Sequence, residues 1–261
     1  MQHVQPAADA IAPQTLDQAL ALLARRDAEL AALRAAQQDW VYAVSHDLRA
    51  PLRHVLAFAP MVQELLQSSN PGADDLTEAR SFLQTMDQSA QRMAAMFDGL
   101  LALSRAARQP LQLQAVNLQQ LRRSVEESLQ PQARIEWSLP DECPGFQADV
   151  PLLLQALGAA LSNAIKFTST TTDAQIKVQV HRDDAARWWI TVSDNGAGFD
   201  DSRAQRLFGL FQRMHRETEF EGAGTGLALV RSICRRHGGD AEIEAKPGQG
   251  CQLRMWWPQA L

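Results

Sequence analysis

The chain has 261 residues, of which 46% are hydrophobic and 21% charged, a composition typical of a folded globular protein with a sizeable core. Its net charge of −5 argues against a nucleic-acid-binding protein, because such proteins usually carry a basic face. Three widely spaced cysteines fit neither a disulfide framework nor a zinc site, and no apolar run reaches the ~20 residues of a membrane span. We therefore expect a cytoplasmic protein with no membrane span and no nucleic-acid partner.

The first predicted elements are a flexible leader over residues 1–15 and a long helix that follows it. The leader combines small residues with prolines and lacks the basic start and apolar core of a signal peptide. Leucines then recur at helical spacing, which predicts a helix with a coiled-coil tendency, at Leu16, Leu20, Leu23, Leu30 and Leu33. Pro51 and Pro60 are predicted to bend this helix, because each removes one backbone hydrogen bond.

A turn signal at 68–75 separates this helix from a second one over about 76–107. The second helix carries large apolar residues at spacings near 3.6, at Phe82, Met86, Met93, Phe97, Leu100 and Leu103. Two long helices joined by a short loop predict a hairpin domain over residues 16–109. Since one hairpin has too little core, we expect a homodimer in which two hairpins form a four-helix bundle.

The remaining residues, 110–261, read as an α/β domain. Runs rich in strand-forming residues at 175–181, 187–194 and 251–258 are combined with helical runs at 150–167 and 224–237. The last strand is expected to form a hairpin around the turn sequence KPGQG.

His46 stands out on the first helix because it faces away from the apolar stripe. At 100° a residue, Leu48 lies close to Val44, whereas His46 lies about 200° away from Val44. A single exposed histidine is usually a solvated surface residue, and His54 is interpreted in that way. Asp47 follows His46 directly, and a carboxylate there can take the proton from one ring nitrogen and leave the other nucleophilic.

Two glycine-rich runs predict a nucleotide pocket in the second half. Asp194 ends a predicted strand, where its carboxylate can accept a hydrogen bond from the amine of adenine, and Gly196 and Gly198 let the backbone approach the base. Three further glycines precede an apolar helix, whose free backbone amides favour phosphate, at Gly222, Gly224 and Gly226. The sequence contains neither a P-loop nor the dinucleotide-binding spacing of glycines.

The helical run LSNAIKFTS, upstream of both glycine-rich runs, supplies the polar partners of this pocket. Asn163 and Lys166 share one face of it; an amide oxygen can ligate Mg²⁺, and an ammonium can pair with phosphate. Residues 200–221 are predicted to form a helix and a charged loop, from which Arg213 and His215 can reach phosphates.

Together these motifs resemble the histidine kinases of two-component signalling, from about residue 36 onward. VSHDLRAPL resembles the phosphoacceptor box, LSNAIKFT the Asn box, DNGAGF and GAGTGLAL the two glycine boxes, and LFGLFQRMH the Phe box. The run FQRMHRETEFEGAGTGLALV is especially similar to phytochrome-like kinases. The resemblance implies a phosphotransfer hairpin followed by an α/β sandwich that binds ATP and Mg²⁺, as in gyrase-type ATPases.

By this resemblance His46 is the phosphoacceptor, Asp47 its proton acceptor and Asn163 the magnesium ligand. Lys166 contacts phosphate, Asp194 binds adenine, residues 200–223 form the ATP lid, and Thr225 and Leu227 belong to the second glycine box. The phosphoryl group then passes to an aspartate on a separate response regulator. No sensor domain is recognised, so we expect either that the chain is a fragment of a longer protein or that an upstream sensor protein is its partner.

One departure from the family leaves two other functions open. Many members have a second Asn four residues before Asn163, where this chain has Ala159. The chain is then a kinase of lowered ATP affinity or a dimeric scaffold with a degraded pocket. An ATPase that drives conformational change ranks last, because Ala159 and Ala160 occupy the places where its water-activating carboxylate is expected.

Overall fold

The computed structural model describes residues 15–67, 72–128, 134–214 and 219–258. The chain divides into two compact units, residues 1–46 and 47–261. Residues 1–14 of the predicted leader lie outside the described part. The helices are α1 (Leu16–Gln67), α2 (Ala73–Arg108), α3 (Leu118–Ser128), α4 (Val150–Thr168), the 3-10 helix η1 (Asp201–Phe208) and α5 (Gly226–Arg236). The strands are β1 (Gln114–Ala115), β2 (Arg134–Ser138), β3 (Gln147–Ala148), β4 (Gln175–Arg182), β5 (Trp188–Asp194), β6 (Asp240–Ala245) and β7 (Cys251–Trp257).

The predicted helical hairpin is confirmed, and its first helix continues through both prolines, Pro51 and Pro60. Within the second unit the rings of Phe58 on α1 and Phe82 on α2 stack with centroids 5.0 Å apart. α2 begins earlier than predicted because the Asp75 carboxylate accepts a hydrogen bond of 2.8 Å from the backbone N–H of Gly72. It ends just before the predicted domain boundary between residues 109 and 110, and that boundary stays a prediction.

The second half is built on a mixed five-stranded sheet with the order β2-β4-β5-β7-β6. β2 runs parallel to β4, and all other neighbours are antiparallel, including the predicted C-terminal hairpin of β6 and β7. The pairing of β5 with β7 places Asp194 opposite Cys251, so the end of one strand lies beside the start of the other. A two-stranded sheet of β1 and β3 was not predicted.

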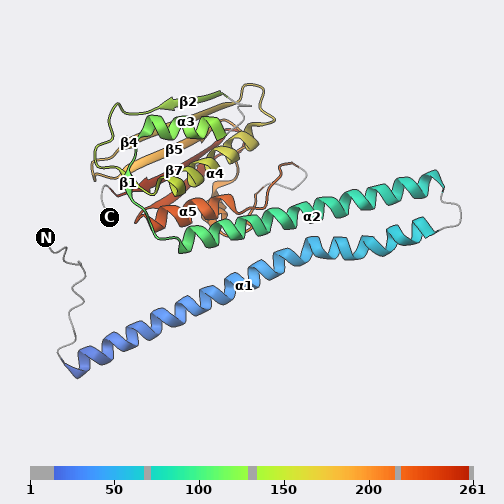
Figure 1. The fold of residues 1–261 in the computed structure, drawn as a ribbon, viewed down its shortest axis with the longest axis horizontal. Coiled ribbons are helices and arrows are strands. Elements are labelled where there is room, and N and C mark those ends of the chain that lie inside the picture. Colours follow the sequence, from blue (N-terminus) through green and yellow to red (C-terminus); the bar gives the residue numbers. More distant parts are fainter. Residues whose placement is uncertain (1–14, 68–71, 129–133, 215–218, 259–261) are drawn as a thin grey trace. The chain divides into compact units, whose positions relative to one another are not determined.

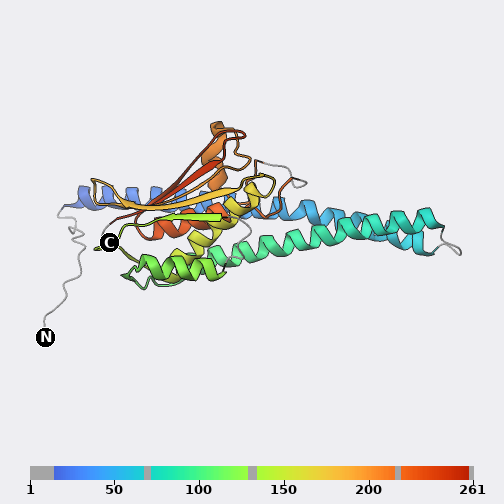
Figure 2. The same cartoon turned by 90° about the horizontal axis from the view of Figure 1, so that it is seen from above.

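Helices α3, α4 and α5 form a second layer on one face of this sheet (Figures 1 and 2). α4 is the central core helix, and its buried side chains are Leu152, Leu153, Ala156, Leu157, Ala160, Leu161, Ala164 and Thr168. Among the described residues α4 is also the helix whose length and mean hydropathy of 1.3 match a membrane span. Its place in the core accounts for this apolar character. The predicted fold class, a helical hairpin followed by an α/β sandwich, is confirmed.

A buried histidine joins three parts of the second half. The His237 Nε2 atom accepts a hydrogen bond of 3.0 Å from the backbone N–H of Asp149, and its Nδ1 lies 2.8 Å from the Ile233 carbonyl. The ring is therefore the neutral tautomer that donates from Nδ1. The Asp149 carboxylate in turn accepts the N–H groups of Leu152, at the start of α4, and of Gln112, in the segment after α2.

We expect the stability of this layer to fall in mild acid through His237. Burial lowers the pKa of His237 below its ordinary value of 6.5, although the Ile233 carbonyl and the Asp149 carboxylate oppose the shift. Below pH 6.5 the unfolded chain therefore binds a proton more readily than the folded chain, and stability declines toward the lowered pKa. Urea unfolding at pH 7.5 and 5.5 should show a larger loss for the native protein than for His237→Gln. Equal losses would contradict this role.

Candidate active site

The phosphoacceptor candidate lies on the exposed side of α1. His46 is exposed, whereas Val44 and Leu48 are half-buried, as the helical periodicity predicted. Its ring stacks on that of Tyr42, one turn earlier, with centroids 6.3 Å apart and an interplanar angle of 25°. Asp47 follows as a half-buried carboxylate. The arrangement leaves the His46 imidazole open to a reagent from solvent.

The predicted adenine-binding carboxylate is held at the end of β5 by backbone donors. The Asp194 Oδ1 atom accepts a hydrogen bond of 2.9 Å from the N–H of Gly196. Burial raises the pKa of Asp194, while hydrogen bonds from the N–H groups of Gly196 and Cys251 partly counteract the rise. A half-buried acceptor fixed in this way suits the amine of a purine.

Gly196 and Gly198, in the loop after β5, pack so closely against neighbouring backbone that no side chain fits. A Cβ atom on Gly196 would lie 2.3 Å from the Phe167 carbonyl oxygen, and one on Gly198 would lie 2.0 Å from that of Lys246. Gly198 also has a positive φ of 59°, which disfavours other residues. The loop is thus pressed between the end of α4 and the β6–β7 turn.

The β6–β7 turn is the part of the site that sequence reasoning missed. The Gly248 N–H donates to the Ala197 carbonyl at 2.8 Å, and a Cβ on Gly250 would lie 1.8 Å from the Asp194 carbonyl oxygen. This turn and Cys251 therefore support Asp194 and the loop that follows it. The sequence signal was the run KPGQG, which was recognised only as a hairpin turn.

The predicted phosphate-binding glycines lie at the start of α5. Gly224 has a φ of 71°, and a Cβ on it would lie 2.9 Å from the Phe211 Cα. Thr225 is the N-cap residue of α5, and Gly226 and the half-buried Leu227 are its first two residues. The first amides of a helix have no partner within the helix, and its dipole favours an anion there. This helix start can therefore bind phosphate.

Two residues of α4 face this helix start. A Cβ built on Gly226 lies 3.6 Å from the Asn163 Nδ2 atom and 3.9 Å from the Ala159 Cβ. The Lys166 Nζ atom donates to Asn163 Oδ1 at 3.3 Å. The structure therefore brings the Asn box and the second glycine box together, as the prediction required.

Arg213 holds residues 220–222 close to Lys166. The Arg213 guanidinium donates to the carbonyl oxygens of Gly222, at 2.7 Å, and of Phe220. Phe220 packs edge-on against Phe167 with centroids 5.0 Å apart, and a Cβ on Gly222 would lie 3.2 Å from the Lys166 Nζ. Burial and the nearby Arg213 cation lower the pKa of Lys166. A phosphate group bound beside Lys166 would therefore stabilise the charged form of its side chain. His215, the other predicted phosphate contact, lies outside the described residues.

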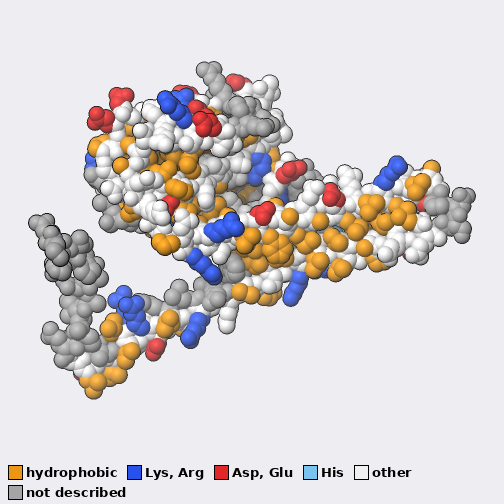
Figure 3. Space-filling model, in the orientation of Figure 1, with side chains coloured by type: hydrophobic (Ala, Val, Ile, Leu, Met, Phe, Trp, Pro, Cys, Tyr) orange, Lys and Arg blue, Asp and Glu red, His pale blue; other side chains and the backbone are white. Residues whose placement is uncertain are grey.

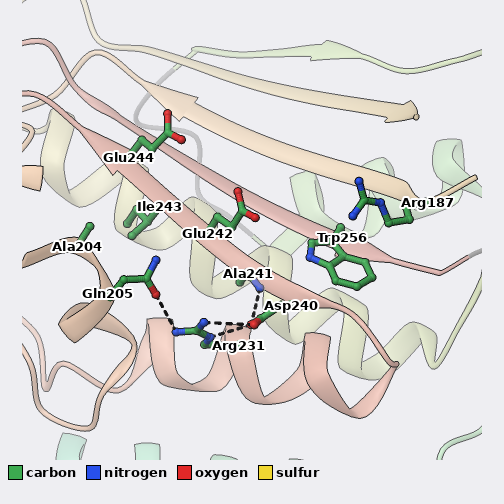
Figure 4. A pocket seen from close by; sticks show the side chains of 10 residues that line it. All are labelled: Arg187, Ala204, Gln205, Arg231, Asp240, Ala241, Glu242, Ile243, Glu244 and Trp256. Atoms are coloured by element: carbon green, nitrogen blue, oxygen red, sulfur yellow. Dashed lines mark hydrogen bonds and ion pairs between the residues drawn. The ribbon is translucent and has the colours of Figure 1, made fainter. Parts of the chain in front are cut away.

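A separate hollow of about 560 Å³ lies beside β6, and none of the predicted nucleotide contacts lines it (Figure 4). There Arg231 of α5 pairs with Asp240 at 2.7 Å and donates to Gln205 of η1 at 3.3 Å. Its guanidinium also lies 4.6 Å from the centre of the Phe208 ring. We interpret Arg231 as the residue that fixes η1 to the core.

Two family models match the chain. Residues 36–109 match the His Kinase A (phospho-acceptor) domain, and residues 148–261 match the histidine kinase-, DNA gyrase B-, and HSP90-like ATPase domain. The phytochrome-like protein Cph1 of Synechocystis is 30% identical over 82% of this chain and 28% of its own length. The adaptive-response sensory kinase SasA of a Synechococcus strain is 30% identical over 82% of this chain and 57% of its own length.

Among solved structures, full-length ShkA in complex with AMPPNP aligns with a TM-score of 0.54 and 25% identity, over 84% of this chain and 45% of ShkA. The chain spans less than two thirds of the length of these relatives. Its two domains nevertheless match in the order that the motifs predicted, with His46 in the first and the glycine-rich pocket in the second. The chain belongs to the ATP-dependent histidine kinases of two-component signalling.

Proposed function

We propose that this chain transfers the γ-phosphoryl group of ATP to its own His46. The observation that carries the proposal is the assembly around the start of α5, where Asn163 of α4 faces Gly226, and Lys166, which donates a hydrogen bond to Asn163, lies beside Gly222. Asp194 supplies an adenine acceptor on the same sandwich. An exposed histidine followed by a carboxylate, in a matched phosphoacceptor domain, supplies the nucleophile.

The proposed step is an in-line displacement at phosphorus. A ring nitrogen of His46 forms the bond to the γ-phosphorus as the bond to the bridging oxygen of ADP breaks. The proton of the other ring nitrogen passes to the Asp47 carboxylate, and the negative charge of the leaving group remains on ADP. Lys166 and the first amides of α5 neutralise phosphate charge, so catalysis consists mostly of positioning and electrostatic stabilisation.

Mg²⁺ fits the donors of this site as a partly hydrated ion. The Asn163 Oδ1 atom is a hard oxygen ligand beside the phosphate-binding helix start. Over the described ranges there is no group of three His, Cys, Asp or Glu side chains that could hold a metal. Mg²⁺ commonly takes one or two protein ligands and completes its shell with phosphate and water. It would neutralise charge on the transferred phosphoryl group.

The test is incubation with γ-labelled ATP and Mg²⁺, followed by acid and base treatment of the protein. A phosphohistidine is expected to give a label that is labile in acid and stable in base. Label of the opposite stability would indicate a hydroxyl acceptor and contradict the proposal. Binding of a labelled nucleotide without incorporation would favour the scaffold function.

We further propose that the phosphoryl group passes to an aspartate of a separate response regulator and that the hairpin dimerises in the cytoplasm. Exposed apolar side chains along α2 and the end of α1 support dimerisation (Figure 3); they include Leu56, Leu66, Leu83, Phe97 and Leu101. Such a surface is typical of a helix face that packs in a bundle. A coiled coil over the start of α1 and an upstream sensor complete the proposed assembly.

The alternative function, a scaffold with a degraded nucleotide pocket, rests on Ala159. A substitution at this position tests whether it limits nucleotide binding. Because Ala159 lies against the start of α5, Ala159→Asn places an amide where it can contact nucleotide phosphates. We expect ATP affinity to rise about threefold to tenfold, the gain of one hydrogen bond. Titration with a fluorescent ATP analogue measures the change, and Ser162→Asn, on the exposed side of α4, is the control. An unchanged affinity for Ala159→Asn would contradict this position's role.

A further inference from the structure

One stripe of α2 contacts the nucleotide-binding half at successive points. Arg92, Gly99 and Ala106 are spaced by seven residues, or about two helical turns, and therefore share one face. All of their contacts described below lie within the second compact unit, residues 47–261. Burial and the nearby Arg92 cation lower the pKa of Arg213. The stripe thus starts near Arg213.

The middle point of the stripe is a contact that only glycine allows. A Cβ atom on Gly99 would lie 2.3 Å from the Oγ1 and 2.6 Å from the Cβ of Thr225. The Thr225 side chain makes no capping hydrogen bond to α5 and instead packs against α2. Because the Thr225 Cβ itself is so near, rotation of the side chain cannot make room. α2 therefore touches the phosphate-binding end of α5 directly.

The last point of the stripe is a hydrogen-bonded clamp. The Arg236 guanidinium donates from Nη1 to the carbonyl oxygen of Ala106 and from Nη2 to that of Gln109. Ala106 lies in the last turn of α2 and Gln109 is its C-cap residue. Carbonyls at this end of a helix lack partners within the helix and favour a cation. Ala106 is only 1% exposed, so the helices are in close contact here as well.

These contacts align the two helices side by side. From Gly99 to Gln109 α2 rises about 15 Å, and from Thr225 to Arg236 α5 rises about 16 Å. The matched lengths place the first contact at the start of α5 and the clamp at its end. The last turns of α2 and the whole of α5 therefore run side by side in the same direction.

We propose that this stripe is a seat that fixes the phosphate-binding end of α5 on the hairpin, with Gly99 and Arg236 as positioning residues for the phosphoryl transfer. The inference rests on the proposed function, since the seat brings the phosphate-binding end to the helical domain that carries the acceptor. Holding donor and acceptor elements together raises their effective concentration, and a small displacement is costly in rate. Neither residue touches the nucleotide in this assignment, so affinity for ATP is not expected to change.

The first test is Gly99→Ala in the full chain. The added methyl group separates α2 from α5 at Thr225, while alanine is about 1 kcal/mol more favourable than glycine within a helix, so α2 itself is not weakened. We expect the labelling rate of His46 at saturating ATP to fall at least about tenfold. The Kd for nucleotide should stay within twofold, and backbone hydrogen exchange in α5 should become faster. Gly158→Ala is the matched control, because a Cβ there meets no atom within 4 Å, and it should change none of these.

The second test keeps the backbone and removes the clamp. Arg236→Ala should lower the maximal labelling rate without changing the Kd, and Arg236→Lys should restore part of the rate. Arg235→Ala is the control, since Arg235 is exposed and pairs with Asp240 at the start of β6. A labelling rate that is unchanged or raised in both Gly99→Ala and Arg236→Ala would overturn the proposal. So would unaltered exchange of α5.

Failure of the proposed kinase function can be distinguished from failure of the seat by different measurements. If the native chain gave no phosphohistidine, the kinase activity would be refuted, but the exchange of α5 would still report whether α2 holds it. Faster exchange in Gly99→Ala and native exchange in Gly158→Ala would then support the seat as a structural element and reject its role in transfer.

Discussion

His46→Gln is expected to abolish the acid-labile label while leaving nucleotide binding unchanged. Glutamine keeps a polar side chain on the exposed side of α1 but has no nitrogen that can attack phosphorus. The proposed nucleotide contacts, including Asp194 and Lys166, belong to other elements and are not altered by the substitution. The measurement is γ-labelled ATP incorporation at saturating Mg²⁺, with fluorescent nucleotide titration of the same preparation.

His54→Gln is the matched control for this substitution. His54 is also an exposed histidine of α1, but Arg53 and Val55 flank it and its ring lies 6.2 Å from that of Phe58. We expect full labelling in this variant. Residual acid-labile label in His46→Gln, or loss of label in His54→Gln, would assign the acceptor role to a different histidine.

The sequence predicted those features that depend on local periodicity or on a single motif. The exposed side of α1 at His46 follows from the helical repeat alone, and α4 and α5 follow from long apolar runs. The two glycine-rich runs were predicted to approach a ligand; in the structure Gly196, Gly198 and Gly224 pack against the protein's own backbone, and their approach to a ligand stays a prediction.

Features that depend on pairing between distant segments could not be predicted. Gly250 and Cys251 support Asp194 only because β7 pairs with β5 in one particular register, and periodicity does not specify which strands become neighbours. The contact of Gly99 with Thr225 joins residues more than a hundred positions apart. In the sequence Gly99 is a glycine inside a helical pattern, a signal that packing demands it but not by what.

Asp194→Asn is expected to weaken ATP binding about tenfold to a hundredfold, the value of a hydrogen bond to a charged acceptor. The carboxylate offers only acceptors to the adenine amine, whereas an Asn side chain can present its own N–H groups and repel it. Because burial already raises the pKa of Asp194, removing its charge should not destabilise the fold. Thermal unfolding and nucleotide titration on the same samples separate the two effects.

Selectivity between purines makes this prediction sharper than affinity alone. The adenine amine is a donor, and the equivalent group of guanine is an acceptor, so Asp194→Asn should reduce the preference for ATP over GTP along with the affinity for ATP. Asp173→Asn, at an exposed carboxylate near the start of β4, should change neither. If Asp194→Asn lost affinity for ATP and GTP equally, the carboxylate would act by shaping the loop through Gly196 and not by contact with the base. That outcome would leave the pocket intact as a phosphate site but would remove the adenine assignment.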